Sequence, residues 1–455
     1  MKIIIAGDGK VGSTLAEHLS QEEHDVTIID TNEETLRRAS DTLDVMCVKG
    51  NGASIAALRQ AGVETADIVI AATSLDEINM VCCLTAKRLG AKYAIARIRN
   101  VEYTVDQVTL QKVLGIDTVI NPEYATAIEI SRLLRFPAAA NIETFFRGRV
   151  ELVSFMVQEG DFFAGRPLTD LSRQVKNLPI LFCAAEQEGE VIIPDGSFVP
   201  KPGSRLYLIG EPIGIQKFFR LLGRYIPGIH SVFILGGGRI SHYLASILLR
   251  MGVEVKVVEQ KEERCRVLSE QLPHSLIICG DGTDQELLES EHFTASDAFV
   301  ALTDRDEDNL IISLYALQRG ISKAIAKSNR PNYAFIARTA GLDSIVTPKL
   351  ITANHILQLV RGMRNSKGSV MTALYQIADG KAEAMEFIAG ANTYGLGLPL
   401  QKLSLKKGIL IAAIVHEGKV IIPEGSSCVS KGDTVIIVSR DQGIMDLSDI
   451  YESMP

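Results

Sequence analysis

Three glycines close to the start of the chain have the spacing of a phosphate-binding turn. Gly7, Gly9 and Gly12 fit the pattern G-x-G-x-x-G, between an apolar, strand-like run at residues 2–6 and a helical pattern. In such a turn the first glycine permits a sharp reversal, the second lets the backbone approach a pyrophosphate, and the third lets the helix pack against the strand. Amides at the helix N-terminus then supply the anion site.

A carboxylate follows the glycine turn at the distance where such folds bind the ribose of a nucleotide. Asp30 ends the second strand-like run, 18 residues after Gly12. It can accept hydrogen bonds from ribose hydroxyls, and its charge disfavours a 2′-phosphate, with no Arg directly after it to reverse that preference. Because the turn, the helix and the acid agree, the sequence predicts an adenine-nucleotide site; a packing motif without a ligand is the alternative.

The same arrangement returns in the second half of the chain. With an offset of 229 residues, Gly236 and Gly238 match the first two glycines, and Glu259 matches Asp30. Ser241 replaces the third glycine. Since the third glycine serves packing more than ligand approach, this change weakens the prediction of a second nucleotide site without removing it.

Polar residues also follow the fourth and fifth strand-like runs, at the sheet edge where ligands of such folds bind. Thr73 and Ser74 could face the nucleotide there, or they could cap the following helix. Arg97 could reach phosphates, or it could be a solvated surface residue. Asn51 stands where the second half has Asp281, so the two halves cannot share an acidic role at that position.

The elements that must position these residues form a duplicated α/β architecture. Short apolar runs alternate with helical patterns over residues 1–122, which predicts a doubly wound, Rossmann-like domain with a parallel sheet. A connecting helix over 122–136, ended by Pro137, leads to a small α+β module at 143–227 with a hairpin turn at 186–190. The second half repeats both parts at 229–348 and 369–453, and "GEVIIPDGS" at 189–197 returns as "GKVIIPEGS" at 418–426. A period this long indicates tandem duplication rather than a solenoid.

Composition excludes several classes of protein. The 455 residues carry a formal net charge of -8, which argues against general binding of nucleic acid or anionic lipid. No apolar run is long enough to span a bilayer, and the N-terminus has no signal-peptide pattern. The seven cysteines have neither metal-binding nor disulfide spacing, and we expect them to be small buried residues in a reducing cytosol.

A reaction on the nucleotide would need more than a binding turn. A dehydrogenase requires a general acid or base near the transferred hydride, yet none of the eight histidines recurs between the halves. The Walker, G-x-S-x-G and H-E-x-x-H motifs are all missing from the sequence, and methyl transfer lacks an obvious acceptor pocket. The sequence therefore favours a non-enzymatic protein whose conformation responds to a bound nucleotide; the alternative is a soluble NAD-dependent oxidoreductase.

The order of these motifs resembles a known family. "GDGKVG", Asp30, "KGNGAS", "ATSLDEINM", "ARIRN" and "EGEVIIPDGSFVPKPGSRLYLIG" recur in both halves and are similar to the RCK (regulator of potassium conductance) family, in particular to the tandem cytosolic subunits of Trk potassium-uptake systems. The resemblance covers essentially the whole chain. It implies two Rossmann-like RCK N-terminal domains, each followed by an RCK C-terminal module, in a homotetramer peripheral to the inner face of the plasma membrane.

The resemblance also implies a partner, ligands and site residues. The partner is a TrkH-type potassium-translocating membrane subunit, gated when nucleotide binding changes the angle between RCK units. Family members bind NAD(H), and some bind ATP or ADP. A nucleotide-responsive regulator of another transporter would share every sequence feature. The matching first-site positions are Gly7, Asp8, Gly9, Lys10, Val11, Asp30, Thr73, Ser74 and Arg97. The matching second-site positions are Gly236, Gly237, Gly238, Arg239, Ile240, Glu259 and Thr303, with Lys327 in place of the Arg.

Overall fold

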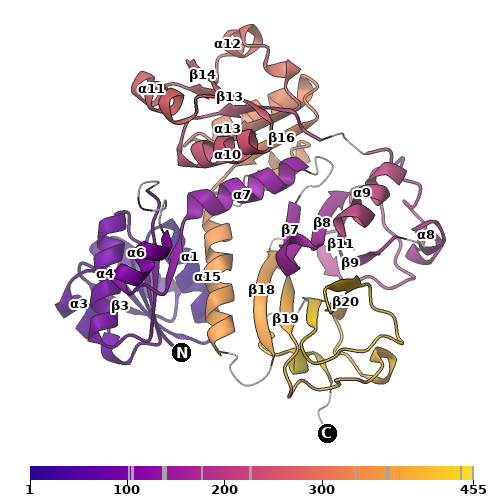
Figure 1. Ribbon diagram of the computed structural model, residues 1–455, viewed down its shortest axis with the longest axis horizontal. Helices are drawn as coiled ribbons and strands as arrows, with labels where there is room; N and C mark the ends of the chain where they lie inside the picture. The colour runs from indigo at the N-terminus through magenta and orange to yellow at the C-terminus, as the bar shows by residue number, and fades with distance from the viewer. Residues whose placement is uncertain are drawn as a thin grey trace. The chain divides into compact units, whose positions relative to one another are not determined.

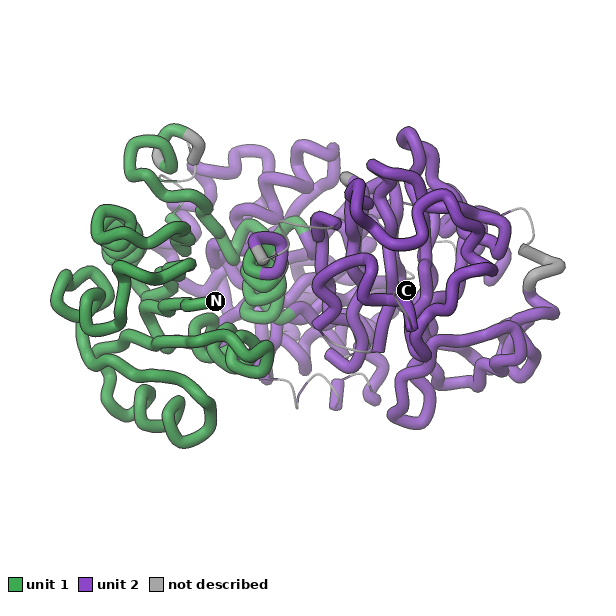
Figure 2. The backbone as a smooth tube through the Cα atoms, turned by 90° about the horizontal axis from the view of Figure 1, so that it is seen from below, with its two compact units in different colours: residues 1–128, 347–360 green, residues 129–346, 361–455 purple. Residues whose placement is uncertain are grey.

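The computed structural model divides the chain into two compact units, residues 1–128 with 347–360 and residues 129–346 with 361–455 (Figure 2). Two boundaries between the units fall within helices, α7 (Pro122–Arg135) and α15 (Pro348–Arg364), and the third falls just before α15. The residues described are 1–100, 103, 107–135, 141–175, 178–224, 228–330, 333, 336–337, 339–364, 369–378, 380–440 and 443–452. Within these ranges no helix combines the length and the apolar character needed to cross a membrane.

The first Rossmann-like domain, drawn in indigo to violet in Figure 1, is built on a six-stranded parallel sheet. The order of its strands is β3-β2-β1-β4-β5-β6. The central strands are buried at consecutive positions, as expected for a sheet covered on both faces. The order reverses between β1 and β4, where doubly wound sheets bind ligands. The strands are β1 (Lys2–Ala6), β2 (Asp25–Asp30), β3 (Met46–Lys49), β4 (Ile68–Ala71), β5 (Tyr93–Arg97) and β6 (Thr118–Ile120).

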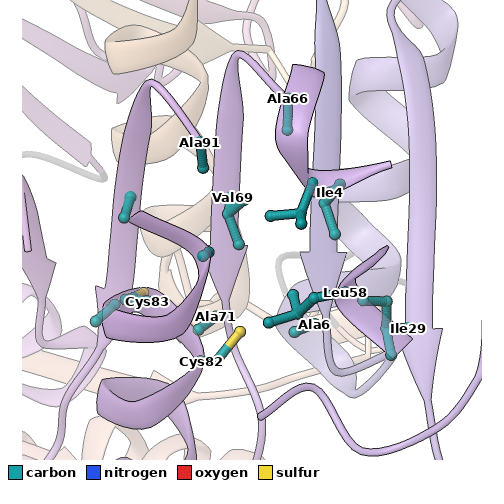
Figure 3. Close-up of a cluster of buried hydrophobic side chains, with 14 of the residues drawn as sticks. Ile4, Ala6, Ile29, Leu58, Ala66, Val69, Ala71, Cys82, Cys83 and Ala91 are labelled. Atoms are coloured by element: carbon teal, nitrogen blue, oxygen red, sulfur yellow. The ribbon is translucent and has the colours of Figure 1, made fainter. Parts of the chain in front are cut away.

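Helices connect these strands and complete the core. Leu58 of α3 and Cys82 and Cys83 of α4 belong to one buried cluster with Ile4 and Ala71 of the sheet (Figure 3). The helix after the glycine turn begins at Lys10, directly after Gly9. Pro137, predicted to end the connecting helix α7, lies outside the described residues. The helices are α1 (Lys10–Gln21), α2 (Glu33–Thr42), α3 (Ile55–Gln60), α4 (Asp76–Leu89), α6 (Gln107–Leu114) and α7 (Pro122–Arg135).

The second Rossmann-like domain repeats the first, with the equivalent parallel order β14-β13-β12-β15-β16-β17. Its strands are β12 (Ser231–Leu235), β13 (Glu254–Glu259), β14 (Leu276–Cys279), β15 (Ala298–Ala301), β16 (Lys323–Lys327) and β17 (Ser344–Val346). Its helices are α10 (Arg239–Arg250), α11 (Glu262–Gln271), α12 (Gln285–Ser290) and α13 (Asp306–Gln318), and α15 (Pro348–Arg364) follows the last strand. The predicted duplication of the α/β domain is therefore confirmed.

Each Rossmann-like domain is followed in the chain by an antiparallel five-stranded sheet. The predicted hairpin turn is present, because Glu188 and Gly189 both have positive φ between β9 and β10. The first small module contains β7 (Asn141–Phe145), β8 (Val150–Met156), α8 (Leu168–Val175), β9 (Ile180–Gln187), β10 (Glu190–Ile192), β11 (Arg205–Gly210) and α9 (Pro212–Leu221). The second contains β18 (Val370–Ile377), β19 (Ala382–Ile388), β20 (Ile409–His416), β21 (Lys419–Ile421) and β22 (Thr434–Ser439).

The two small sheets share one hydrophobic core within the second unit. The hydroxyl of Tyr375 donates to the carbonyl of Thr144 at 2.9 Å, and the hydroxyl of Tyr207 accepts from the amide of Ala378 at 3.0 Å. The Tyr375 ring also meets Phe145 edge to face, with ring centroids 5.1 Å apart. Each small module thus contributes a tyrosine hydroxyl that hydrogen-bonds the backbone of the other module. These two bonds fix the position of one sheet against the other.

A buried ion pair joins α15 to the second small sheet. Both terminal nitrogens of Arg361 lie 3.0 Å from the carboxylate oxygens of Glu383, and the two side chains are 2% and 0% exposed. In the first half, Arg135 of α7 lies 3.5 Å from Glu151 of the first small sheet, and Arg132 pairs with Glu129 on its own helix at 3.4 Å. Both halves thus join a helix to a small sheet through an ion pair, but Arg135 is about half exposed, whereas Arg361 is buried.

Candidate functional site

The first glycine turn is shaped by close backbone contacts. Gly7 has φ +102°, and a Cβ there would lie 2.8 Å from the backbone nitrogen of Thr73. A Cβ on Gly12 would lie 1.9 Å from the carbonyl oxygen of Gly7, so the helix can approach the turn this closely only with glycine at that position. These contacts agree with the packing roles predicted for the first and third glycines.

Gly9 leaves the N-terminus of α1 open. It is the N-cap residue of this helix, no side chain caps the helix there, and a Cβ built on Gly9 would meet nothing within 4 Å. Val11 is buried and Lys10 is exposed, so the first turn presents backbone amides beside a flexible cation. An anion can bind at such a helix end through unpaired N–H groups and the helix dipole.

Asp30 holds the turn in place from the end of β2. One carboxylate oxygen accepts from the backbone N–H of Asp8 at 2.7 Å, and the other accepts from the N–H of Asn32 at 2.8 Å. A carboxylate oxygen has room for a further donor, so these bonds leave capacity for ribose hydroxyls. Asp30 is only partly buried, which keeps that capacity accessible.

Asp8 brings a second carboxylate to the same place. Burial, with the charge of Asp30 as a smaller cause, raises the pKa of Asp8 to about 6. Among the residues that the structure describes, its Oδ1 is buried without a hydrogen-bond partner. From the sequence, Asp8 is predicted only as one position of the turn, because the acidic pair forms when the turn folds against β2.

Thr73 lies at the edge of the sheet with the glycine turn, but its hydroxyl is engaged within the protein. The hydroxyl is 2.7 Å from Asn79 Oδ1, and the Thr73 N–H donates to the same oxygen at 2.8 Å. Helix α4 has Leu75 as its N-cap residue and no side-chain cap, so Thr73 and Ser74 do not cap it as the alternative proposed. Arg97 ends β5, the strand next to β4 in the sheet, and it is partly buried.

The second glycine turn has the same frame with different chemistry. Gly236 has φ +94°, and a Cβ on Gly238 would meet nothing within 4 Å. The hydroxyl of Ser241 donates to the Gly236 carbonyl, so a hydrogen bond replaces the close approach made by the third glycine in the first half. Glu259 accepts from the N–H of Gly237 at 2.7 Å, as Asp30 does from Asp8.

Charges around the second turn differ from those around the first. Gly237 replaces the acid of the first turn, and the Arg264 Nε donates to the Gly237 carbonyl at 2.8 Å. Arg239 is exposed, and Ile240 is buried. Lys327, which replaces the Arg of the first half, is buried and lies 3.6 Å from Asp304. The two sites therefore present different electrostatic fields to a nucleotide.

A buried asparagine makes equivalent hydrogen bonds behind each of the two sites, Asn79 in the first and Asn309 in the second. Asn309 repeats Asn79: its Oδ1 accepts from the Thr303 N–H at 2.9 Å, and its Nδ2 donates to the Lys327 carbonyl at 3.0 Å. Asn51 and Asp281 each accept from the amide two residues later, at 2.9 Å, so both act first as turn residues.

The cysteines do not all fit the expectation of burial. Cys82, Cys83, Cys183 and Cys265 are buried, but Cys279 and Cys428 are exposed. Cys279 is exposed because it ends β14, an edge strand of its sheet.

The chain matches known proteins along its length. The TrkA-N domain model matches residues 3–122 and again 232–348. A Trk system potassium uptake protein TrkA homolog of Methanosarcina mazei is 34% identical, covering 99% of this chain and 100% of the relative. The Trk system potassium uptake protein TrkA of Halomonas elongata is 33% identical, covering 99% of both chains.

Solved structures with this fold include the GsuK RCK domain, with a TM-score of 0.62 at 18% identity, covering 96% of this chain and 92% of that one. The GsuK channel bound to NAD has a TM-score of 0.62 at 19% identity, covering 96% and 76%. GsuK bound to ADP has a TM-score of 0.51 at 16% identity, covering 79% and 68%. The paired parallel and antiparallel sheets are those of an RCK gating-ring fold, and with its two TrkA-N domains the chain belongs to the TrkA family of potassium-uptake proteins.

Proposed function

We propose that this protein is the nucleotide-binding regulatory subunit of a Trk-type potassium-uptake system. In this proposal NAD(H), or another adenine nucleotide, binds in the Rossmann-like domains and changes the opening of a TrkH-type potassium-translocating membrane subunit. The observation that carries the proposal is the open helix N-terminus at Gly9 beside the partly accessible carboxylate of Asp30. It combines an anion site with a ribose site at the switch point of the sheet.

The first site is proposed to hold its ligand in three parts. The pyrophosphate lies on the amides of residues 9–11, because the amides of Gly7 and Asp8 donate to Ile29 and Asp30. Lys10 lies close to the pyrophosphate, and the ribose hydroxyls donate to Asp30. Ser74 and Arg97 complete the edge next to the phosphates. Thr73 is proposed to contribute through its position, since its hydroxyl bonds Asn79.

A regulatory role for the nucleotide is favoured over its turnover. The relatives carry Trk potassium-uptake names, and the GsuK channel has been solved with NAD and with ADP. A ligand shifts a conformational equilibrium only through its different affinities for the two states, and coupling of about 1–3 kcal/mol changes opening by roughly 5- to 150-fold. We further propose a homotetramer on the cytoplasmic face of the membrane.

Nucleotide binding is tested with the purified full chain by calorimetry with NAD, NADH, ADP and ATP. Asp30→Ala removes the ribose acceptor and is expected to weaken first-site binding about 10- to 150-fold, the effect of losing charged hydrogen bonds of about 1.5–3 kcal/mol. Asp25→Ala is the matched control, because Asp25 is an exposed carboxylate at the opposite end of β2. Equal affinity of Asp30→Ala and wild type would contradict the site.

Gating is tested by potassium flux through a TrkH-type subunit in vesicles, with and without this protein. We expect flux to change over a nucleotide titration with wild type and Asp25→Ala, and to change much less with Asp30→Ala. If wild type binds nucleotide but the potassium flux stays the same over the whole nucleotide titration, the proposed regulation is refuted. Steady oxidation or reduction of NAD(H) with a small-molecule substrate would instead establish the oxidoreductase alternative.

A further inference from the structure

Two cysteines meet beside the acid of the second glycine turn. Cys265 lies on α11 and Cys279 ends β14, two elements in contact with each other (Figure 1). Cys279 is paired in register with Glu259, and the Cys265 thiol lies 3.2 Å from the Glu259 carbonyl oxygen. The same carbonyl accepts from the N–H of Gly280, the residue after Cys279, at 3.0 Å.

The alternation of the strand turns Cys279 toward α11. Ile278 packs into the core cluster that contains Leu288 of α12, so its neighbour Cys279 faces the opposite side of the sheet. There the Cys279 side chain interacts electrostatically with the Cys265 thiol. The strand register and the packing of α11 on β14 thus bring the two cysteines to one face of the sheet before any bond joins them.

The two thiols differ in the way that a reactive and a resolving cysteine differ. Cys279 is exposed, so a small reagent can reach it. Cys265 is 7% exposed, and burial together with its contact to Cys279 raises its pKa to about 11. Reaction therefore begins at Cys279, because the thiolate is the attacking form and access limits exchange.

The first half of the chain cannot form this pair. Its equivalent positions are Leu36 on α2 and Lys49 at the end of β3, and Lys49 pairs with Glu33 at 2.6 Å. The cysteine pair is thus a property of the second site alone. The first site provides an internal control for any effect of oxidation.

We propose that Cys265 and Cys279 form a reversible disulfide through exchange with a low-molecular-weight disulfide such as oxidised glutathione. The Cys279 thiolate attacks one sulfur of the reagent and releases one glutathione thiol. Cys265 then gives up its proton, attacks the Cys279 sulfur and releases the second glutathione thiol. One protein disulfide forms, one glutathione disulfide is reduced to two thiols, and atoms and electrons balance.

The bond has a consequence for the second turn, and this part rests on the proposed function. A disulfide sulfur carries no hydrogen, so oxidised Cys265 loses its hydrogen bond to the Glu259 carbonyl, and its sulfur comes to about 2 Å from that of Cys279. Arg264, the residue before Cys265, donates a hydrogen bond to the Gly237 carbonyl, and Glu259 accepts one from the Gly237 amide. Disulfide formation therefore disturbs the segment that fixes the turn, and it weakens nucleotide binding at the second site.

The disulfide is tested on the reduced full chain, exchanged into oxidised glutathione and digested without reduction. Peptide mass spectrometry is expected to find Cys265 cross-linked to Cys279, with two thiols lost, in wild type and in Cys428→Ser, which lacks the other exposed thiol. Cys265→Ala and Cys279→Ser are expected to lose the cross-link. Glutathione retained on Cys279 of wild type without a cross-link, or cross-links only between chains, would overturn the proposal.

The effect on binding is measured in the Asp30→Ala background, which silences the first site. The dissociation constant of the second site is expected to rise about fivefold on oxidation, the effect of losing one neutral hydrogen bond, and to recover with reductant. An unchanged constant despite a mapped cross-link would refute the coupling. If the second site binds no nucleotide even when the cysteines are reduced, the proposed function fails at that site. Peptide mass spectrometry still decides whether the Cys265–Cys279 disulfide forms.

Discussion

The side-chain amide of Asn79 donates a 2.8 Å hydrogen bond to the backbone carbonyl of Arg97. Asn79 is fully buried on α4, and it also bonds Thr73, which follows β4, through both its amide and its oxygen. It therefore ties the ends of β4 and β5 together directly behind the glycine turn. The residues proposed to face a nucleotide at these two strand ends are therefore positioned by a buried side chain.

Asn79→Asp is expected to loosen this edge of the first domain. An aspartate keeps the acceptor but faces the carbonyls of Thr73 and Arg97 without a donor, and a buried polar group left unpaired costs about 1–3 kcal/mol. Hydrogen exchange of peptides covering β4 and β5 should become faster. Asn309→Asp is the matched variant, and it should affect peptides of β15 and β16 instead; unchanged exchange in both variants would show that neither asparagine is a brace.

Gly12→Ser should damage the first turn, although serine is the native residue at the equivalent position of the second. Its Cβ would lie 1.9 Å from the Gly7 carbonyl oxygen, and relieving such overpacking costs about 1–3 kcal/mol. We expect loss of nucleotide binding at the first site by calorimetry. The reciprocal change, Ser241→Gly, removes only a hydroxyl bond of about 1 kcal/mol and should leave the second site functional. Retained first-site affinity in Gly12→Ser would contradict the packing argument.

The contrast between these two positions shows what the sequence could and could not predict. Apolar runs predicted the strands of the first sheet, and the signal is strongest in β1, β2 and β4, where at least four consecutive residues are buried. The helix Gln107–Leu114 was not singled out, since Val108, Thr109 and Val113 are β-branched and lower its helical propensity. Ser241 could be recognised as a departure, but its bond to Gly236 depends on the helix position in three dimensions.

Asp8 should make binding at the first site depend on pH. Its pKa is raised to about 6 in the folded protein, and a nearby pyrophosphate favours the protonated carboxyl further. Binding then takes up a proton, so affinity is greatest below pH 6 and is lost as pH rises through that value. If the bound pyrophosphate raises the pKa of Asp8 by one further unit, binding is about tenfold weaker at pH 8 than at pH 5.

This pH dependence is measured by titrating NAD into Glu259→Ala, which isolates the first site. Asp8→Asn is expected to bind equally well at both pH values, at least as tightly as the starting protein does at pH 5. The second site, isolated in Asp30→Ala, has Gly237 in place of the acid and serves as the control. A pH profile that Asp8→Asn leaves unaltered would assign the titration to another group.

Breaking the buried pair in the second unit should be costly, whereas replacing the whole pair should not. Arg361→Met leaves Glu383 charged and buried, which costs about 3–5 kcal/mol, and the double variant Arg361→Met/Glu383→Met should recover most of this loss. Urea unfolding of the full chain measures the difference. Lys201→Met removes an exposed pair with Glu188 and should change stability by about 0–1 kcal/mol. A small effect of Arg361→Met, equal to that of Lys201→Met, would refute the argument.

The candidate site divides in the same way into predictable and unpredictable parts. Spacing alone located the glycines and the two acids that end β2 and β13, because local turn geometry restricts those positions. The contacts of Asp8 with Asp30, of Asn79 with Arg97 and of Cys265 with Cys279 each join residues that are at least 14 positions apart in the sequence, and they depend on how β2, α4 and α11 pack. Such contacts leave no periodic signal in a single sequence.

The common core of the two small sheets changes how the duplication can be understood. Tyr207 and Tyr375 bind these sheets to each other within one polypeptide, so their association is unimolecular and does not weaken on dilution. A tethered partner is present at a fixed effective concentration, whatever the amount of protein in the cell. Because the two small sheets pair with each other, neither has to keep a surface that binds a second copy of itself. The glycine turn of one half can then change in sequence while the turn of the other half keeps its chemistry.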